Sequence, residues 1–202
     1  KDTSRGLGDV YKRQEQAETL KRLANLIAEK NKQHNLTSAR TPEEIYKTHI
    51  NDCVQAFKKA QKTLRKTVID CGSGAGLPGL VWATLDTNKK IYTVDSTNKK
   101  IAFQKLAIRE LALENVVAVN DRIQNVVLDQ ENTVVFKAFS SVKEGVLSLN
   151  KKNNHKNILF LKKDDEKTEQ EITEASSLLY DYKRHEYASN NTKMLVLELY
   201  DS

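Results

Sequence analysis

The sequence has little cysteine, little proline and no long apolar run. Its two cysteines, Cys53 and Cys71, form no C-x-x-C pair and no cluster with histidine, which excludes a disulfide-rich secreted scaffold and indicates no metal site. No stretch approaches the roughly 20 apolar residues of a membrane-spanning helix, and no signal peptide is visible. We therefore expect a cytoplasmic protein that binds neither a metal nor a membrane.

Positive side chains outnumber negative ones. The 202 residues include 33 Lys and Arg against 27 Asp and Glu, a net charge of +6 at pH 7. This excess favours a polyanionic partner such as a nucleic acid, although a basic surface that only faces solvent gives the same composition. The length fits one domain with an appendage, large enough to bury about 70% of its unfolded surface.

The first residues do not read as native protein. Residues 4–14, SRGLGDVYKRQ, are the translation of the end of a transposase-based sequencing adapter. We therefore treat residues 1–14 as an artefact, expect the native N-terminus to be missing, and expect the segment to pack against nothing. It carries four positive and two negative side chains, so a net charge of +4 remains without it.

Two amphipathic helices are predicted in residues 15–66, ahead of the main domain. Apolar residues recur three and four positions apart over residues 15–31, which is the pattern of one buried helix face. Thr41 is a predicted N-cap, and Glu44 stands where a capping box needs an acid. With a proline at the first helical position, these signals predict a second helix over residues 42–60.

From residue 67 to residue 202 strand and helix patterns alternate. We expect helices from about 79, at 98–112, 142–149 and 165–179, and strands at 67–71, 90–95, 115–119, 133–137, 157–162, 181–188 and 193–200. Such a βαβ series predicts a mostly parallel sheet. The last two strands meet at Asn190-Asn191, which predicts a β-hairpin. The expected fold class is α/β and Rossmann-like, with seven strands and extra N-terminal helices.

The stretch between the first strand and its helix carries the strongest chemical signal. VIDCGSGAGLPG, residues 68–79, ends an apolar strand at Asp70 and opens into a turn with Gly72, Gly74 and Gly76. Glycines let backbone N–H groups approach an anionic ligand, and the following helix offers further donors. A nicotinamide fingerprint needs glycine where Leu77 stands. The turn resembles the glycine motif of S-adenosylmethionine (SAM) methyltransferases, with an ordinary strand-to-helix turn as the alternative.

Candidate side chains follow the later strands. Asp95 ends the second strand, where Rossmann-like folds place an acid on a ribose diol; the alternative is a cap for the next helix. Ile123 and Gln124 follow the third strand and are candidates to pack on an adenine ring and to read its edge. Lys137 ends the fourth strand and is a candidate contact for the SAM carboxylate or the target nucleotide, with a solvent-facing lysine as the alternative.

Residues 136–141 argue against two chemistries of nucleic-acid methylation. They contain neither the Asn/Asp-Pro-Pro-Tyr/Phe motif of enzymes that act on amino groups nor the cysteine nucleophile of enzymes that act on cytosine carbon. Guanine N7 needs neither, because its lone pair attacks the methyl group with no proton to remove first. Alignment and electrostatic support then carry most of the rate.

Longer stretches resemble one family, ribosomal RNA small subunit methyltransferase G, also called glucose-inhibited division protein B. The matching stretches, in the family's order and spacing, are HNLTS at 34–38, HIND at 49–52, residues 70–79, VDS at 94–96 and LENV at 113–116. The resemblance implies a SAM-dependent enzyme, expected to be a monomer, that methylates N7 of guanine 527 in bacterial 16S rRNA, free or in an assembling 30S subunit. It also implies that Gly72, Leu77, Ile123 and Gln124 match cofactor-contacting positions.

The sequence departs from this family in places. The family's Arg-Ala-Phe-Ala-Ser is KAFSS at 137–141, so a lysine point charge replaces an arginine fork. Lys162 matches a family lysine, but Lys163 stands where a glycine usually follows. Two alternatives therefore stay open: a degenerate, non-catalytic methyltransferase-like protein that binds nucleotide or RNA and, less favoured, a nicotinamide-dependent oxidoreductase.

Overall fold

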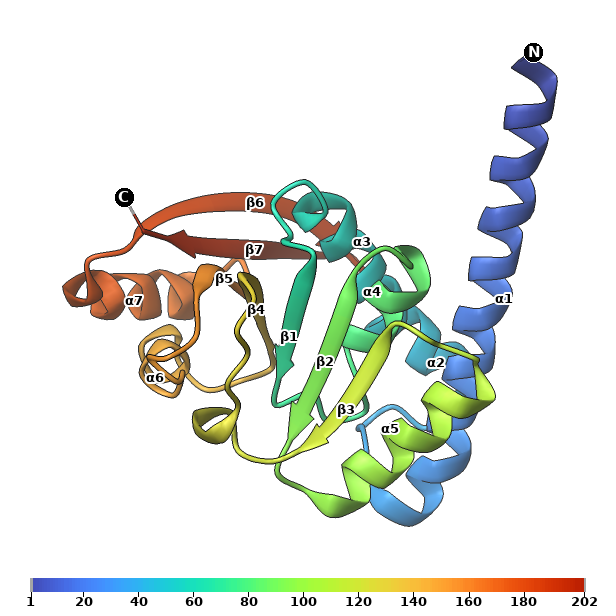
Figure 1. Ribbon diagram of the computed structural model, residues 1–202, viewed down its shortest axis with the longest axis horizontal. Coiled ribbons are helices and arrows are strands. Elements are labelled where there is room, and N and C mark those ends of the chain that lie inside the picture. The colour runs from blue at the N-terminus through green and yellow to red at the C-terminus, as the bar shows by residue number, and fades with distance from the viewer. Residues whose placement is uncertain (1, 202) are drawn as a thin grey trace.

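Seven strands form one sheet in the order β3-β2-β1-β4-β5-β7-β6 (Figure 1). The computed structural model describes residues 2–201, with side chains from residue 8 onward. The strands are β1 (Thr67–Cys71), β2 (Lys90–Asp95), β3 (Val116–Asn120), β4 (Asn132–Lys137), β5 (His155–Lys163), β6 (Asp181–Ser189) and β7 (Thr192–Tyr200). This confirms the predicted seven-stranded α/β fold.

The parallel part of the sheet is centred on β1, which pairs with β2 on one side and β4 on the other. All of β1 is buried, including the polar Thr67 and Asp70, as expected of a central parallel strand covered on both faces. At the far edge, β7 runs antiparallel to both β5 and β6. Asn190 and Asn191 join the hairpin with φ of +49° and +59°, the left-handed pair that a two-residue turn needs.

Helices cover both faces of the sheet. On one face α4 (Gly79–Leu85) and α5 (Asn98–Glu110) pack with the N-terminal helices, and on the other lie α6 (Val142–Leu147) and α7 (Glu166–Ala175). The strands alternate accordingly, so that Val68 faces the first cluster and Ile69 the second. None of the helices within residues 2–201 is both long and apolar enough to cross a membrane.

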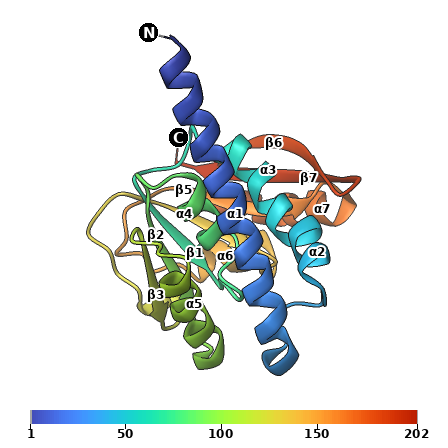
Figure 2. The same cartoon turned by 90° about the vertical axis from the view of Figure 1, so that its right-hand side faces the viewer.

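The N-terminal helices lie across one side of the sheet domain that begins at β1 (Figure 2). They are α1 (Asp2–His34), α2 (Pro42–Ile45), a π-helical segment (Tyr46–Ile50) and α3 (Asn51–Ala60). Leu23 and Ile27 of α1 are fully buried. The indole Nε1 of Trp82 donates to the carbonyl of Cys53 at 3.0 Å, which ties α4 to α3.

Helix α1 starts earlier than the sequence pattern predicts. It continues through residues 2–14 as a projecting rod (Figure 1), because extending an existing helix costs far less than nucleating one. Val10 and Tyr11 are 59% and 67% exposed. The side chains of residues 1–7, the first half of the adapter-like segment, lie outside the described part. Firm attachment begins at Gln16, whose Nε2 donates to the carbonyls of Thr84 and Leu85.

The second helix also differs from prediction, because a π-helical segment interrupts residues 42–60. Ile45 and Ile50 stand five residues apart and are both fully buried, which the wider π turn permits and a regular α-helix does not. The hydroxyl of Thr41 accepts from Glu44 N–H at 3.1 Å, as an N-cap should. The predicted capping box is incomplete, since the Glu44 carboxylate accepts from Arg40 N–H instead.

Deleting residues 1–14 should leave the melting temperature unchanged, because the described side chains at the end of this segment are largely exposed. A thermal melt followed by circular dichroism measures this. The control is Leu23→Ala, which empties a buried position of the same helix and should cost about 2–5 kcal/mol. A clear fall in melting temperature on deletion would show that the segment packs against the domain.

Candidate functional site

The turn after β1 is built from glycines in left-handed conformations. Gly72, Gly74 and Gly76 have φ of +66°, +58° and +81°, values that L side chains rarely adopt. At Gly76 a Cβ atom would stand 2.5 Å from a methyl carbon of Leu80. The N–H groups of Gly72 and Ser73 donate to the carbonyl of Val94, at 2.9 and 3.0 Å, so the turn is anchored to β2.

Asp70 holds this turn from beneath. Its side chain is fully buried, and Oδ2 accepts from the N–H of Gly79, the first residue of α4, at 2.8 Å. Burial raises the pKa of this carboxyl to about 7, and the Gly79 N–H and the charge of Lys137 limit the rise. Its Oδ1 has no hydrogen-bond partner among the residues that the structure describes. Asp70 thus shapes the loop and does not reach the cavity described below.

Asp95 joins the glycine turn to the next helix. Its Oδ2 accepts from Gly74 N–H and its Oδ1 from Thr97 N–H, both at 2.9 Å. Lys100 Nζ lies 3.8 Å from Asp95 Oδ2, and the Asp95 side chain is 7% exposed. The sequence left a choice between a ligand contact and a helix cap. The structure shows that Asp95 steadies the entry to α5, and that it also faces the cavity.

A cavity of about 370 Å³ opens at the carboxyl ends of β1, β2 and β3. It is lined by Gly72, Val94, Asp95, Ser96, Thr97, Lys100, Asp121, Arg122, Ile123, Gln124, Phe139 and Ser148. The structure therefore brings together the predicted Gly72, Asp95, Ile123 and Gln124. Its position, outside the carboxyl ends of parallel strands, is where open α/β sheets bind their ligands.

Other predicted site residues do not line this cavity. Gly74 and Gly76 shape the turn beside it, and Leu77 is half-buried and packs on the core of the N-terminal helices. Lys137 is only 17% exposed, and its Nζ lies 3.6 Å from Asp52 Oδ2 on α3. The alternative of a solvent-facing Lys137 is therefore wrong. The ammonium is directed toward the N-terminal helices.

Lys137 belongs to a polar cluster where the N-terminal region meets β4 and β6. This cluster, the Asp52 cluster, is formed by Thr37, His49, Asp52, Lys137 and Tyr187. The hydroxyl of Tyr187, on β6, donates to Asp52 Oδ1 at 3.0 Å, and His49 Nε2 lies 2.5 Å from the Thr37 hydroxyl. Burial, and then the charge of Lys137, lowers the pKa of His49. Burial, and then Asp52, raises the pKa of Tyr187. The cluster thus connects the N-terminal helices to the sheet at its carboxyl edge.

The sequence patterns missed several residues of the site. Phe139 lines the cavity, and its ring packs on Phe136 with centroids 4.7 Å apart. Lys100 and Arg122 add positive charge to the rim. The sequence offered a signal for each of these residues: Arg122 and Phe139 follow the ends of strands, and Lys100 lies in the first turn of a helix. Asp52 lies in the HIND stretch that matches the family, but its partner Tyr187 is far away in sequence and gave no signal.

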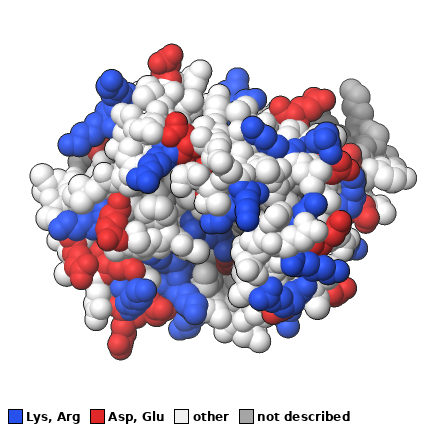
Figure 3. Space-filling model, turned by 90° about the horizontal axis from the view of Figure 1, so that it is seen from below, with Lys and Arg blue, Asp and Glu red and all other residues white. Residues whose placement is uncertain are grey.

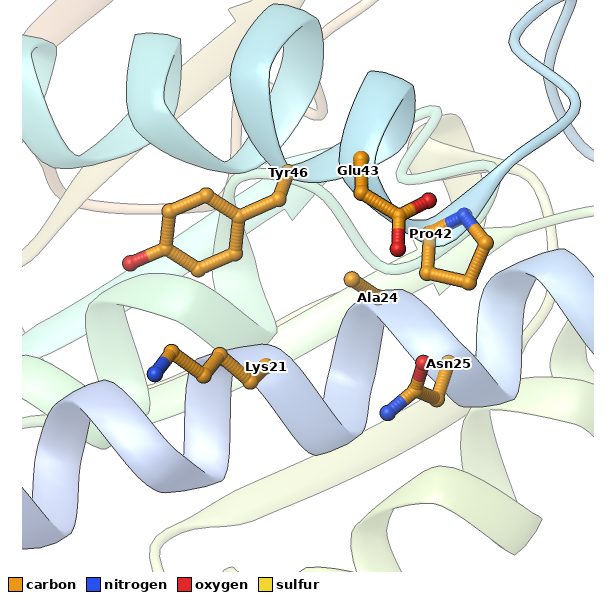
Figure 4. A pocket seen from close by; sticks show the side chains of 6 residues that line it. All are labelled: Lys21, Ala24, Asn25, Pro42, Glu43 and Tyr46. Carbon is orange, nitrogen blue, oxygen red and sulfur yellow. The ribbon is translucent and has the colours of Figure 1, made fainter.

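Positive charge gathers on this side of the molecule. Figure 3 shows the face at the carboxyl ends of the strands, where Lys and Arg side chains surround a recess near the middle. A second cavity, of about 420 Å³, lies between α1 and α2 and is walled by side chains such as Lys21, Glu43 and Tyr46 (Figure 4). It has no glycine turn and no buried acid at its walls. Within residues 2–201 no group of three or more His, Cys, Asp or Glu is placed to hold a metal ion.

Comparison with known families shows to which family the chain belongs. A sequence model of the GidB family, described as rRNA small subunit methyltransferase G, matches residues 16–196. The chain belongs to this family. The relatives include a ribosomal RNA small subunit methyltransferase G from Clostridium botulinum (strain Eklund 17B / Type B), 41% identical over half of this chain and 42% of that protein. Another, from Pasteurella multocida (strain Pm70), is 41% identical over 64% of this chain and 61% of its own length. The matched stretches thus span about half of these relatives.

Solved structures of methyltransferases share the architecture of this GidB family member. A SAM-dependent methyltransferase from Aquifex aeolicus superposes with a TM-score of 0.56 at 16% identity, over 73% of this chain and 91% of that one. M. capricolum TrmK, solved with S-adenosyl-homocysteine, gives 0.55 at 11% identity, over 73% and 68%. At such low identities these likenesses show the fold alone. They agree with the sheet order and the terminal hairpin.

Asp70 should make the free energy of unfolding depend on pH. Its pKa of about 7 in the folded chain lies above the value of about 3.9 of an unfolded chain, so the native state binds more protons between these two values. Its contribution to stability is therefore complete below about pH 4 and is lost as the pH rises through about 7. Urea denaturation from pH 5 to 8 measures this for wild type and Asp70→Asn.

The difference in unfolding free energy between wild type and Asp70→Asn isolates the carboxyl group from the histidines, which titrate in both proteins. We expect the wild type to lose stability relative to the variant as the pH rises. The groups that act on the carboxylate are the Gly79 N–H, Lys137 and Asp95. A difference that stays constant over this range would mean that Asp70 is ionised throughout.

Proposed function

We propose that this protein is a SAM-dependent methyltransferase that methylates N7 of guanine 527 in 16S rRNA, in the bacterial cytoplasm and as a monomer. The observation that carries the proposal is the bond from Gly74 N–H to Asp95 Oδ2, at 2.9 Å. It joins the glycine turn to an acid at the edge of the cavity, in a chain that belongs to the GidB family.

The residues of the cavity fit the parts of SAM. Asp95 uses one bond on each carboxylate oxygen for backbone N–H groups, and a carboxylate offers about four lone-pair sites, so acceptor capacity remains for a ribose diol. Val94, Ile123 and Phe139 supply apolar surface for an adenine ring, and Gln124 is exposed beside them. SAM, when bound, supplies an electrophilic methyl group on a sulfonium.

The chain's own task in the reaction is alignment. Guanine N7 carries an in-plane lone pair and no proton, so the proposal requires no general base, and none is assigned to His49 or to any other histidine. The carboxyl edge of the sheet has to hold the base in line with the methyl group and keep water out. Lys137, at the end of β4 and paired with Asp52 at 3.6 Å, is the proposed source of positive charge on this side of the site.

The charged face supports an RNA substrate. Lys100 and Arg122 line the cavity, and the recess in Figure 3 is surrounded by further Lys and Arg. Phosphates of a folded rRNA segment are the polyanion that such a face accepts. Free 16S rRNA and an assembling 30S subunit offer the same chemistry.

A second candidate is a methyltransferase-like protein that binds SAM and RNA without transferring the methyl group. The specific observation in its favour is Lys137, which replaces the family's arginine and is turned onto Asp52. A lysine cannot offer the two parallel hydrogen bonds of a guanidinium. Both candidates predict SAM binding, and only the first predicts a methylated product.

Asp95→Ala should weaken SAM binding about tenfold or more, the loss expected when one charge-assisted contact to the ligand is removed. The variant also deprives Gly74 and Thr97 N–H of their acceptor, so the free energy of unfolding should fall by about 1–3 kcal/mol. Calorimetric titration of folded protein measures the affinity. Glu131→Ala, a change at an exposed acid that pairs with Lys156 and does not line the cavity, is the matched control and should bind SAM like the wild type.

The same titration with NAD tests the function against the oxidoreductase alternative, and NAD should not bind. Tight NAD binding, or no binding of SAM to the wild type, would contradict the proposed function. Equal SAM affinity of Asp95→Ala and wild type would mean that Asp95 only steadies the turn and α5.

Affinity for 16S rRNA should fall steeply as salt is raised, because each phosphate contact releases condensed counterions. Filter binding or fluorescence anisotropy at several salt concentrations gives the slope of log affinity against log salt. Arg122→Ala should make that slope less steep by about one unit, the change expected when one phosphate contact is lost. Lys156→Ala, at the amino-end edge of the sheet and paired with Glu131, is the control and should leave the slope unchanged. A flat salt response of the wild type would reject docking through this face.

A further inference from the structure

The wall of the cavity formed by Phe139 belongs to a segment without regular structure, residues 138–141, between β4 and α6. The ring lies against the glycine turn: a Cβ atom added at Gly72 would be 3.2 Å from Phe139 Cδ2. The segment begins with Ala138 at φ +51°, a left-handed conformation that alanine rarely adopts. Such a conformation persists only where surrounding contacts enforce it.

Lys162 on β5 supplies contacts to the backbone of this segment. Its Nζ donates to the carbonyl of Ser140 at 2.6 Å and lies 3.5 Å from the carbonyl of Phe139. The side chain is only 12% exposed. An ammonium has three donors, so Lys162 holds the Ser140 carbonyl through a short bond and also attracts the neighbouring carbonyl of Phe139.

Glu171 on α7 completes the arrangement. Its Oε2 lies 2.8 Å from Lys162 Nζ, and the same oxygen accepts from the N–H of Val142 at 3.2 Å. The Glu171 side chain is 9% exposed. One buried ion pair therefore contacts backbone groups within the segment, at residues 139 and 140, and directly after it, at residue 142.

Stability alone does not account for such a pair. Two buried charges lose their hydration, and apolar residues of similar volume often replace a buried ion pair with no loss of stability. What distinguishes this pair is where its remaining bonds go. They end on the backbone of the one segment that carries an aromatic ring into the cavity.

We propose that Lys162 and Glu171 are positioning residues, which fix the Phe139 wall and thereby set the affinity of the cavity for SAM. This inference rests on the proposed function. Neither side chain lines the cavity, so both act through Phe139. Lys163, the next residue on β5, is exposed and has no part in the arrangement.

The test compares stability with SAM affinity in the double variant Lys162→Met/Glu171→Leu. A single substitution would leave one buried charge unpaired and risk unfolding, whereas the double variant removes both. We expect its melting temperature to fall by no more than about 10 °C, because Val142 N–H and the Ser140 carbonyl lose their partners. The dissociation constant for SAM should rise about tenfold. The control is Glu169→Gln on the same helix, which breaks an ion pair with Arg184 away from the segment and should leave SAM affinity unchanged.

A double-mutant cycle with Phe139→Ala separates positioning from general destabilisation. If the pair acts through Phe139, removing the pair in the Phe139→Ala background should cost little further SAM affinity, so the two effects are not additive. Additive losses would overturn the proposal. If the double variant does not fold, Lys162→Gln/Glu171→Gln also removes both charges but keeps polar atoms for the Ser140 carbonyl and the Val142 N–H. It should still weaken SAM binding about threefold, and unchanged affinity there would overturn the proposal as well.

The outcomes also distinguish this inference from the proposed function. Failure of the wild type to bind SAM would overturn both. Equal SAM affinity of a folded double variant and the wild type would overturn the positioning role and leave the proposed function in place.

Discussion

The buried carboxylate of Asp70 is the constraint from which the site is built. Its bond to Gly79 N–H, at 2.8 Å, fixes where β1 turns into α4, and the glycines between them take the left-handed conformations that this path demands. Burying a carboxyl group is costly, and the N-terminus of α4 offsets part of that cost. Because the turn is held from beneath, Gly74 N–H is free to reach Asp95 on the next strand.

The sequence predicted those features that depend on local patterns. The strands of the sheet, the hairpin at Asn190-Asn191 and the acid at the end of β2 all follow from periodicity and turn chemistry over a few residues. The family resemblance included Asp52 in the HIND stretch, but the sequence did not predict that it contacts Tyr187, because the two residues are 135 positions apart. The π-helical segment also has no local sequence signature, since it depends on tertiary packing, in which both Ile45 and Ile50 are buried.

Within the site, the sequence predicted which residues belong to it better than it predicted the role of each residue. Gly72, Ile123 and Gln124, which the resemblance implied, lie at one cavity together with Asp95, which was predicted from its place at a strand end; Leu77, which the resemblance also implied, does not line this cavity. Asp70 and Lys137 are buried beneath and beside it, where they act on the loop and on α3. The N-terminal helices are thus bonded to the sheet through Asp52 and Tyr187, and to α4 through Cys53 and Trp82.

Mass spectrometry of nuclease digests of 16S rRNA, after incubation with this protein and SAM carrying a labelled methyl group, tests the central claim most directly. Both free 16S rRNA and 30S subunits from cells that lack this modification are the substrates, with an incubation without SAM as the control. We predict one labelled methyl group, on N7 of guanine 527. Absence of label from both substrates, with SAM binding intact, would contradict methyl transfer and leave a protein that binds without catalysis.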